Sequence, residues 1–166
     1  MSIATTDLGD QFENDIHAGL IHVLPPVFQS FGQAGTFHGQ AVTFKVFEDN
    51  TLIKKALEND NGTGKVMVVD GGASVRCALV GGNIAKAGTQ NGWAGIVVDG
   101  CVRDTGEINE LNIGVRALAA MPLRSLKKGA GERDLGVHIQ GVRVNPGDWV
   151  YADEDGIVIS PKSLHE

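Results

Sequence analysis

Two short apolar runs, each closed by an Asp-Gly pair, most restrict the folds open to this chain. The first is Lys65-Val-Met-Val-Val69, which stops at Asp70-Gly71. The second is Ala94-Gly-Ile-Val-Val98, which stops at Asp99-Gly100. A short, nearly continuous apolar run is typical of a strand that is covered on both faces, as in a parallel sheet. The chain is therefore expected to build a layered α/β fold around such strands.

Helical and strand-like segments alternate around these two runs. Residues 40–47 alternate in the manner of a strand, and residues 51–57 follow a capping segment and place their apolar side chains on one face. Residues 83–91 and 105–111 are expected to be helices, and residues 115–121 form a third apolar strand. A polar helix is expected within residues 5–19, whereas Ala73–Val80 is helical or looped. This order predicts parallel βα units.

The character of the sequence changes after Leu135. Short strand patterns recur at 137–139, 142–144, 149–151 and 156–159, joined by turns such as Asn145-Pro-Gly-Asp148. These segments predict an antiparallel patch at the C-terminal end. The predicted fold class is thus a layered α/β domain with a parallel βα core, in a single domain over residues 1–166.

Composition excludes several classes of function. The formal net charge is −6, so a broad electrostatic grip on nucleic acid is not expected. No apolar run approaches the roughly 20 residues that a membrane helix needs, and no secretory signal is visible. Cys77 and Cys101 are expected to be buried, reduced thiols. We therefore expect a cytoplasmic protein with neither a membrane nor a nucleic acid as direct partner.

Two polar, glycine-rich segments follow predicted strands, where ligands bind in open α/β sheets, and a third glycine turn leads into a predicted helix. The first two are Asp70-Gly71-Gly72 and Asp99 to Asp104, and the glycine turn is Gly81-Gly82. We expect them to converge on one cleft, with the glycines exposing N–H groups at a helix start. Asp70 and Asp99 are more typical of turn-forming residues before glycine than of ligands.

The pair Arg103-Asp104 carries the most chemical information. Arginine binds a carboxylate through two parallel hydrogen bonds and stabilises a developing enolate. Aspartate offers hard oxygen ligands to Mg²⁺ or Mn²⁺. The spacing alone nevertheless favours a solvated ion pair in a surface loop. Arg133-Asp134 illustrates that alternative, because the same dipeptide stands there in a Gly- and Lys-rich loop.

Other motifs give little support for a site. The five histidines have no HExxH or HxxxH spacing, and no glycine cluster has the GxGxxG or Walker A form. Nucleotide-dependent and methyltransferase functions are therefore disfavoured. Lys127-Lys128 is interpreted as a solvated basic loop.

An ordered set of motifs resembles the family of the regulator of ribonuclease activity A. That family includes 4-hydroxy-4-methyl-2-oxoglutarate aldolases and oxaloacetate decarboxylases. The resemblance covers nearly the whole chain. The matching segments are Phe47-Glu-Asp-Asn50, Val68-Val-Asp70-Gly-Gly72, Leu79-Val-Gly-Gly-Asn-Ile84, Asn91-Gly-Trp-Ala-Gly-Ile-Val-Val98, Gly100-Cys-Val-Arg-Asp104, Gly131-Glu132 and Tyr151-Ala-Asp-Glu-Asp-Gly-Ile157.

The resemblance implies a β/β/α swivelling-type domain, assembled as a homotrimer with its cleft near a subunit boundary. Arg103 would bind the pyruvyl part of the substrate and stabilise its enolate. Asp104 would hold Mg²⁺ or Mn²⁺, largely through water. The helix start at Gly81, Gly82, Asn83 and Ile84 would offer N–H groups to the substrate carboxylate.

The implied function is that of a class II, metal-dependent lyase of 2-oxo acids. It would cleave 4-hydroxy-4-methyl-2-oxoglutarate to pyruvate and decarboxylate oxaloacetate. Catalytic members of the family carry an Asp separated from the Arg-Asp pair by twenty residues, and this position is Gly82 here. Loss of that group predicts weaker catalysis. The alternative is a non-catalytic regulator that binds and inhibits an endoribonuclease and so modulates RNA turnover.

Overall fold

The computed structural model describes residues 3–166. The strands are β1 His22–Val23, β2 Gln29–Phe31, β3 Phe37–Lys45, β4 Lys65–Asp70, β5 Ala78–Val80, β6 Gly95–Val102, β7 Gly114–Ala120, β8 Glu132–Arg133, β9 Val137–Ile139, β10 Val142–Val144, β11 Trp149–Ala152 and β12 Ile157–Ser160. The helices are α1 Thr5–Gln11, α2 Glu13–His17, α3 Thr51–Asn59, α4 Gly82–Gln90 and α5 Thr105–Ile108.

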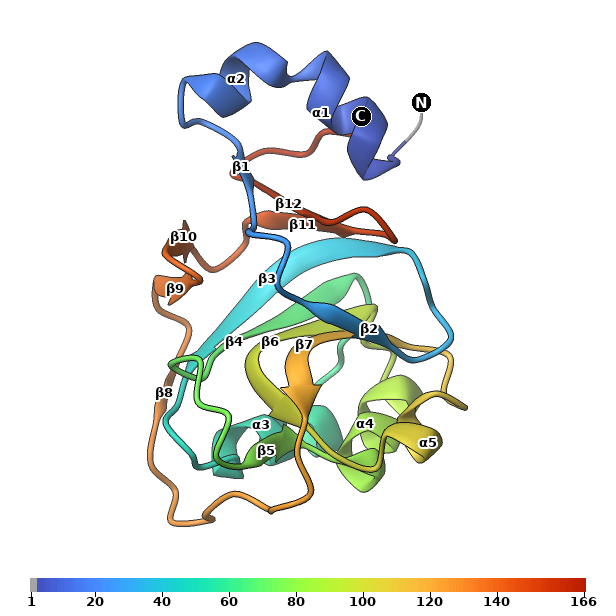
Figure 1. The fold of residues 1–166 in the computed structure, drawn as a ribbon, viewed down its shortest axis with the longest axis vertical. Helices are drawn as coiled ribbons and strands as arrows, with labels where there is room; N and C mark the ends of the chain where they lie inside the picture. The colour runs from blue at the N-terminus through green and yellow to red at the C-terminus, as the bar shows by residue number, and fades with distance from the viewer. Residues whose placement is uncertain (1–2) are drawn as a thin grey trace.

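Most strands join one mixed sheet in the order β1-β12-β11-β3-β4-β6-β7-β2, with β5 beside β6 and β8 beside β3. The neighbours β3, β4, β6 and β7 run parallel, whereas β11 and β12 are antiparallel to their partners. Figure 1 shows α3, α4 and α5 below the parallel strands β3, β4, β6 and β7, with β11, β12 and the N-terminal helices above these strands. The predicted layered α/β class, with a parallel core and an antiparallel C-terminal patch, is confirmed.

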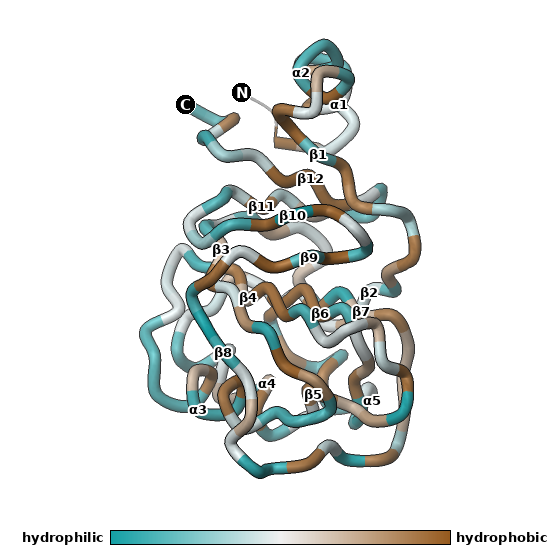
Figure 2. The backbone as a smooth tube through the Cα atoms, turned by 90° about the vertical axis from the view of Figure 1, so that its left-hand side faces the viewer, coloured by the Kyte–Doolittle hydropathy of each residue, from teal (hydrophilic) through white to brown (hydrophobic). Residues whose placement is uncertain are grey.

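The continuous apolar run of β4 is explained by two separate cores. Met67 and Val69 pack into the core that the helices cover. Val66 and Val68 point to the opposite face, into the core closed by β9, β11 and β12. Strand side chains alternate between the two faces, so a strand between two cores must be apolar at every position. Figure 2 shows the corresponding apolar colour along β4 and β6 in the middle of the molecule.

Two glycines in neighbouring strands make room for one aromatic ring. A Cβ at Gly95 of β6 or at Gly114 of β7 would overlap the ring of Phe37. The guanidinium carbon of Arg116 lies 5.1 Å from the centre of the same ring. Phe37, at the start of β3, is therefore packed against the first residues of the other parallel strands.

The N-terminal helices are tied to the C-terminal strands. The carboxylate of Asp153 accepts hydrogen bonds from the N–H and the hydroxyl of Thr5, at 2.7 and 2.6 Å. Burial alone would raise the pKa of Asp153, but these bonds and backbone donors outweigh it and hold the pKa below its ordinary value. Leu8 and Ile21 pack against Tyr151 in a third, smaller core.

The structure differs from the expected elements mainly around β5 and β6. The second apolar run was expected to stop at Asp99-Gly100, yet β6 continues to Val102 through an irregularity after Val98. Pairing with β5 on one side and β7 on the other supplies hydrogen bonds that extend the strand. Cys77 and Cys101 are buried free thiols, as predicted, and burial raises the pKa of both. Within residues 3–166, we find no helix with the length and apolarity that a membrane crossing requires.

Candidate functional site

The candidate site lies where β5 and β6 end. These strands are parallel neighbours, so their carboxyl ends meet at the same edge of the sheet. Gly81 follows the last residue of β5, and Arg103 follows the last residue of β6. A pocket of about 270 Å³ opens between them. Small-molecule sites usually measure about 300–1,000 Å³, so this pocket suits a small ligand.

Arg103 and Asp104 lie together, as the sequence predicts, and both face the glycine pair that opens α4. A Cβ at Gly81 would lie 3.1 Å from Oδ2 of Asp104 and 3.7 Å from Nε of Arg103. Among residues 3–166, Arg103 forms no ion pair, and its guanidinium makes a single long hydrogen bond, 3.4 Å, to the carbonyl of Pro122. Arg103 and Asp104 therefore form no ion pair with each other, although Asp104 is exposed to solvent.

Asp104 is held in an unusual backbone conformation. Its φ is 57°, in the left-handed region, and it precedes the first residue of α5. Its Oδ2 accepts a hydrogen bond of 3.0 Å from the N–H of Gly82. The carboxylate thus caps α4, and its other oxygen remains available to a ligand.

The start of α4 offers fewer donors than the sequence suggests. Asp104 already uses the N–H of Gly82. The N–H groups of Asn83 and Ile84 stand in the first turn, where a helix has no internal partner for them. Of the four predicted residues, Asn83 and Ile84 are therefore the ones whose N–H groups can reach an anion.

Lys127 is a pocket residue that the sequence analysis missed. We interpreted Lys127-Lys128 as a solvated loop, but Lys127 lines the pocket and its Nζ donates a 2.9 Å hydrogen bond to Oδ1 of Asn50. Asn50 is buried and donates in turn to the carbonyl of Leu79. The backbone N–H of Lys128 binds Asp49, which fixes the loop. No local sequence pattern identifies Lys127 as a pocket residue, because its partner Asn50 stands 77 positions earlier in the chain.

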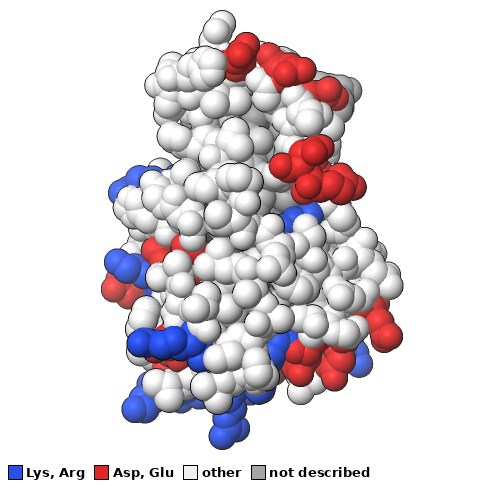
Figure 3. Space-filling view, in the orientation of Figure 1, with Lys and Arg blue, Asp and Glu red and all other residues white. Residues whose placement is uncertain are grey.

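The pocket is rich in unpaired positive charge. Partial burial lowers the pKa of Lys127, and three neighbouring cations lower it further. These cations are Lys54, Arg103 and Arg124, all of which line the pocket. Within the described part of the chain, none of the four forms an ion pair. Figure 3 shows Lys and Arg gathered at the end of the molecule opposite the N-terminal helices. Such a cluster favours an anionic ligand.

Asp70 and Asp99 do not reach this pocket. Asp70 accepts hydrogen bonds from the backbone of Gly72 and His138, and Asp99 binds the backbone and side chain of Gln140. The expectation that Asp70-Gly71-Gly72 shares one cleft with Gly81-Gly82 and the segment Asp99 to Asp104 was therefore wrong. Side chains along β4 and β6 alternate between the two faces of the sheet, which explains why these carboxylates point away from the pocket. Asp70 lies on the same face as Val68, and Asp99 lies on the same face as Val97. Strand β9 covers that face.

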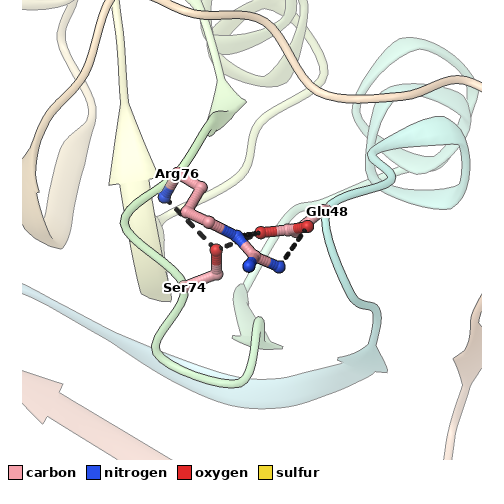
Figure 4. A network of polar contacts seen from close by, with 3 residues as sticks. All are labelled: Glu48, Ser74 and Arg76. Atoms are coloured by element: carbon pink, nitrogen blue, oxygen red, sulfur yellow. Dashed lines mark hydrogen bonds and ion pairs between the residues drawn. The ribbon is translucent and has the colours of Figure 1, made fainter.

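A polar network fixes the loop beside the pocket (Figure 4). Arg76 binds both carboxylate oxygens of Glu48 at 2.6 and 2.8 Å, and the hydroxyl of Ser74 donates to the same carboxylate. The hydrogen bond from Arg76 lowers the pKa of Glu48. Four exposed apolar side chains stand near this network. Phe47 lies under the guanidinium of Arg76, Val75 precedes Arg76 in the chain, and Leu123 and Leu126 line a hollow together with Glu48 and Arg76. We call these four residues the apolar rim.

A larger hollow of about 370 Å³ lies elsewhere, between residues 23–30 and 153–157. Two buried charged side chains line it, and both have partners. Asp153 accepts hydrogen bonds from Thr5, and Arg116 donates to the carbonyls of Gly35 and Asp153 and stacks on Phe37. Burial lowers the pKa of Arg116. Because these partners satisfy its guanidinium, Arg116 is explained by structure, and this hollow is the weaker candidate.

The comparisons with known proteins agree on one family. A family model described as "RraA-like: Aldolase/RraA" matches residues 5–159. A Paraburkholderia phymatum protein, provisionally named 4-hydroxy-4-methyl-2-oxoglutarate aldolase, is 57% identical over 164 residues, which cover 99% of each chain.

Two solved structures resemble this one over nearly all of its length. The RNA-processing inhibitor RraA from Thermus thermophilis has a TM-score of 0.90 and 46% identity, covering 100% of this chain and 98% of its own. A Geobacillus kaustophilus structure described as S-adenosylmethionine: 2-dimethylmenaquinone methyltransferase has a TM-score of 0.90 and 43% identity, covering 97% and 96%.

Proposed function

Because the chain belongs to the RraA-like family, we propose that it is a metal-dependent lyase of small 2-oxo acids. Its reactions would be the class II aldol cleavage of 4-hydroxy-4-methyl-2-oxoglutarate to two pyruvates and the decarboxylation of oxaloacetate. The name of the Paraburkholderia relative supports the first of these. The observation that carries the proposal is the set of unpaired cations around Asp104 in one small pocket. Both substrates carry two carboxylates, and such anions need this kind of charge.

The pocket supplies the two contacts that an enolate-forming reaction requires. Arg103 presents a guanidinium without an ion-pair partner, suited to the oxo group and carboxylate of a pyruvyl unit. Lys127 stands on the same pocket wall, steadied by Asn50. Negative charge grows on the oxo oxygen as the carbon–carbon bond breaks, so cations placed beforehand stabilise the transition state more than the substrate.

The residues also fit a divalent cation. Within residues 3–166, no group of three or more His, Cys, Asp or Glu side chains forms a metal cage. Mg²⁺ does not require one, because it keeps several waters and binds through one or two carboxylates. Asp104 provides a carboxylate with one oxygen outside its bond to Gly82. A bound Mg²⁺ or Mn²⁺ would polarise the oxo group of the substrate.

The test measures pyruvate release with a coupled assay, using both substrates with Mg²⁺ and with Mn²⁺. Asp104→Asn keeps the size of the side chain but removes its charge, and we expect a loss of at least about 100-fold. Asp134→Asn is the matched control, since Arg133-Asp134 repeats the dipeptide outside the pocket. Absence of pyruvate above the uncatalysed rate with either metal would contradict the proposal.

A methyltransferase function, named for the Geobacillus structure, is not proposed. The chain has no GxGxxG loop of the kind that holds such cofactors.

We further propose that the protein assembles as a homotrimer through the apolar rim. These four side chains are between 54% and 59% exposed, and they lie beside the pocket around the Glu48–Arg76 pair. Contiguous exposed apolar surface usually marks an interaction site. Light scattering after size exclusion would give three times 17.5 kDa for the wild type. A monomer at micromolar concentration would contradict this assignment.

A second candidate function is inhibition of an endoribonuclease. It is supported by the resemblance to the Thermus RNA-processing inhibitor and by the charge of the N-terminal helices. Asp7, Asp10, Glu13 and Asp15 lie on α1 and α2, which carry no Lys or Arg (Figure 3). An acidic surface could occupy a basic RNA-binding segment of a nuclease. A pull-down with an endoribonuclease, followed by an RNA-cleavage assay, tests this candidate independently of lyase activity.

A further inference from the structure

A lyase that passes through a pyruvate enolate must move protons as well as stabilise charge. The aldol cleavage removes a proton from the hydroxyl group at C4 and later delivers one to C3. Arg103 cannot serve, because its guanidinium does not lose a proton in proteins. Asp104 already caps α4 and would hold the cation. The proposed function therefore leaves a role that the residues named so far do not fill.

The geometry points to Glu107 as the proton-transfer group of this pocket, an inference that rests on the proposed lyase function. A Cβ built on Gly82 would overlap Oε2 of Glu107, and it would also lie 3.1 Å from Cβ of Asp104. The carboxylate of Glu107 thus fills the place that a side chain at position 82 would take. Gly82 itself lines the pocket, directly beside Asp104.

The local structure holds Glu107 in this place. Glu107 stands on α5, three residues after Asp104, which directly precedes this short helix. Ile108 is fully buried in the core that α4 shares, which fixes α5 against α4. The backbone is therefore anchored, and the exposed carboxylate is carried to the first residue of α4.

The carboxylate of Glu107 is also available for chemistry. Within the described residues, it takes part in no ion pair and accepts no hydrogen bond, unlike Asp70, Asp99 and Asp153. Glu58, on α3, is the glutamate that lines the pocket itself. Glu107 is not one of the lining residues, but its carboxylate is the group nearest to a Cβ built on Gly82, which does line the pocket. Of these two glutamates, Glu107 is therefore the one whose carboxylate lies beside Gly82.

The reaction balances with Glu107 alone as proton carrier. Its carboxylate takes the C4 hydroxyl proton while the C3–C4 bond breaks. The electron pair of that bond moves to the pyruvyl oxo oxygen beside Arg103, and the first pyruvate forms. Glu107 then returns the proton to C3 of the enolate, which gives the second pyruvate. With oxaloacetate, protonated Glu107 gives its proton to C3 after CO₂ leaves, and water restores it.

The experiment compares Glu107→Gln and Glu107→Asp with the wild type and with Glu110→Gln, an exposed glutamate one turn further along the chain. Three quantities are measured with Mg²⁺ present. They are pyruvate release across a pH series, exchange of the pyruvate methyl protons in D₂O by NMR, and the affinity for oxalate by calorimetry. Methyl exchange reports proton transfer at C3 without carbon–carbon cleavage. Oxalate resembles the enolate and reports binding without turnover.

We expect Glu107→Gln to lower both kcat and methyl exchange by about 10²–10⁴-fold. KM and the oxalate affinity should stay within about threefold, because Arg103 and Lys127 remain. Glu107→Asp should recover part of the rate. Glu110→Gln should match the wild type.

A double variant tests directly whether a side chain at position 82 and the carboxylate of Glu107 occupy the same space. Gly82→Asp in the Glu107→Ala background places a carboxylate in the vacated space, and we expect at least about tenfold recovery over Glu107→Ala. Wild-type rates and exchange in Glu107→Gln would overturn this inference and leave the lyase function intact. An equal loss of oxalate affinity would overturn it in favour of a binding role. A wild type without pyruvate release, exchange or oxalate binding would overturn both proposals.

Discussion

Replacement of Lys127 by Met separates the charge of the pocket from the stability of the fold. Met keeps the length of the aliphatic chain and removes the ammonium group. A hydrogen bond to a charged group contributes about 1.5–3 kcal/mol. Lys127 is solvent-exposed, so the lower end of that range applies. Since about 1.4 kcal/mol corresponds to a factor of ten, oxalate should bind about tenfold more weakly.

The unfolding free energy of the same variant should change little. Loss of the bond from Lys127 to Asn50 costs about 1.5 kcal/mol, the lower end of the same range. Relief of repulsion from the other three cations, which lower the pKa of Lys127, acts in the opposite direction. We expect a net change below about 1 kcal/mol in urea unfolding.

Calorimetry with oxalate and Mg²⁺ gives the affinity, and Lys128→Met is the matched control. Lys128 is adjacent in sequence but does not line the pocket. Raising the salt concentration should weaken binding in the wild type more than in Lys127→Met. Equal oxalate affinity in the wild type and Lys127→Met would refute the assignment of an anion site to this pocket.

Three further predictions concern the scaffold. Gly95→Ala should destabilise the fold by about 1–3 kcal/mol, because the new methyl group overlaps Phe37, and urea unfolding measures this; an unchanged midpoint would contradict the packing. Thr5→Val should lower the melting temperature at pH 7 by removing a donor to Asp153. The pKa of Asp153 is lower in the folded state, so this stabilisation is present above pH 4 or so and is lost as the pH falls through the folded pKa. The two proteins should therefore converge in acid, and a gap that widens there would refute the linkage. Leu123→Glu should dissociate the proposed trimer in light scattering without loss of helical circular dichroism, whereas an intact trimer would exclude Leu123 from the interface.

The central strands were predictable because burial on both faces produces a simple sequence pattern. A run such as Val66 to Val69 must be apolar at every position when both faces pack against a core. The joint position of Gly81 and Arg103 was expected, but its cause was not, because Ala73–Val80 was predicted to be helical or looped. The short strand β5, which runs parallel to β6, brings the two residues to one edge of the sheet.

Other parts of the site depend on contacts distant in sequence. The link between Lys127 and Asn50 crosses 77 positions and leaves no periodic signal. The different direction of Asp70 requires knowing which face β9 covers, and β9 is specified far downstream. Glu107 enters the corner beside Gly82 only through the packing of α5 on α4.

The left-handed backbone at Asp104 restricts how this position can diverge. Among residues with a side chain, Asn and Asp adopt that conformation most readily, and glycine adopts it freely. If Asp104 holds the proposed cation, a descendant that no longer binds it can change to Asn or Gly by a single substitution and keep the shape of its loop. Bulkier residues adopt the left-handed conformation poorly, so they would require a different backbone conformation at position 104. The backbone therefore limits which substitutions can remove the proposed cation-binding carboxylate.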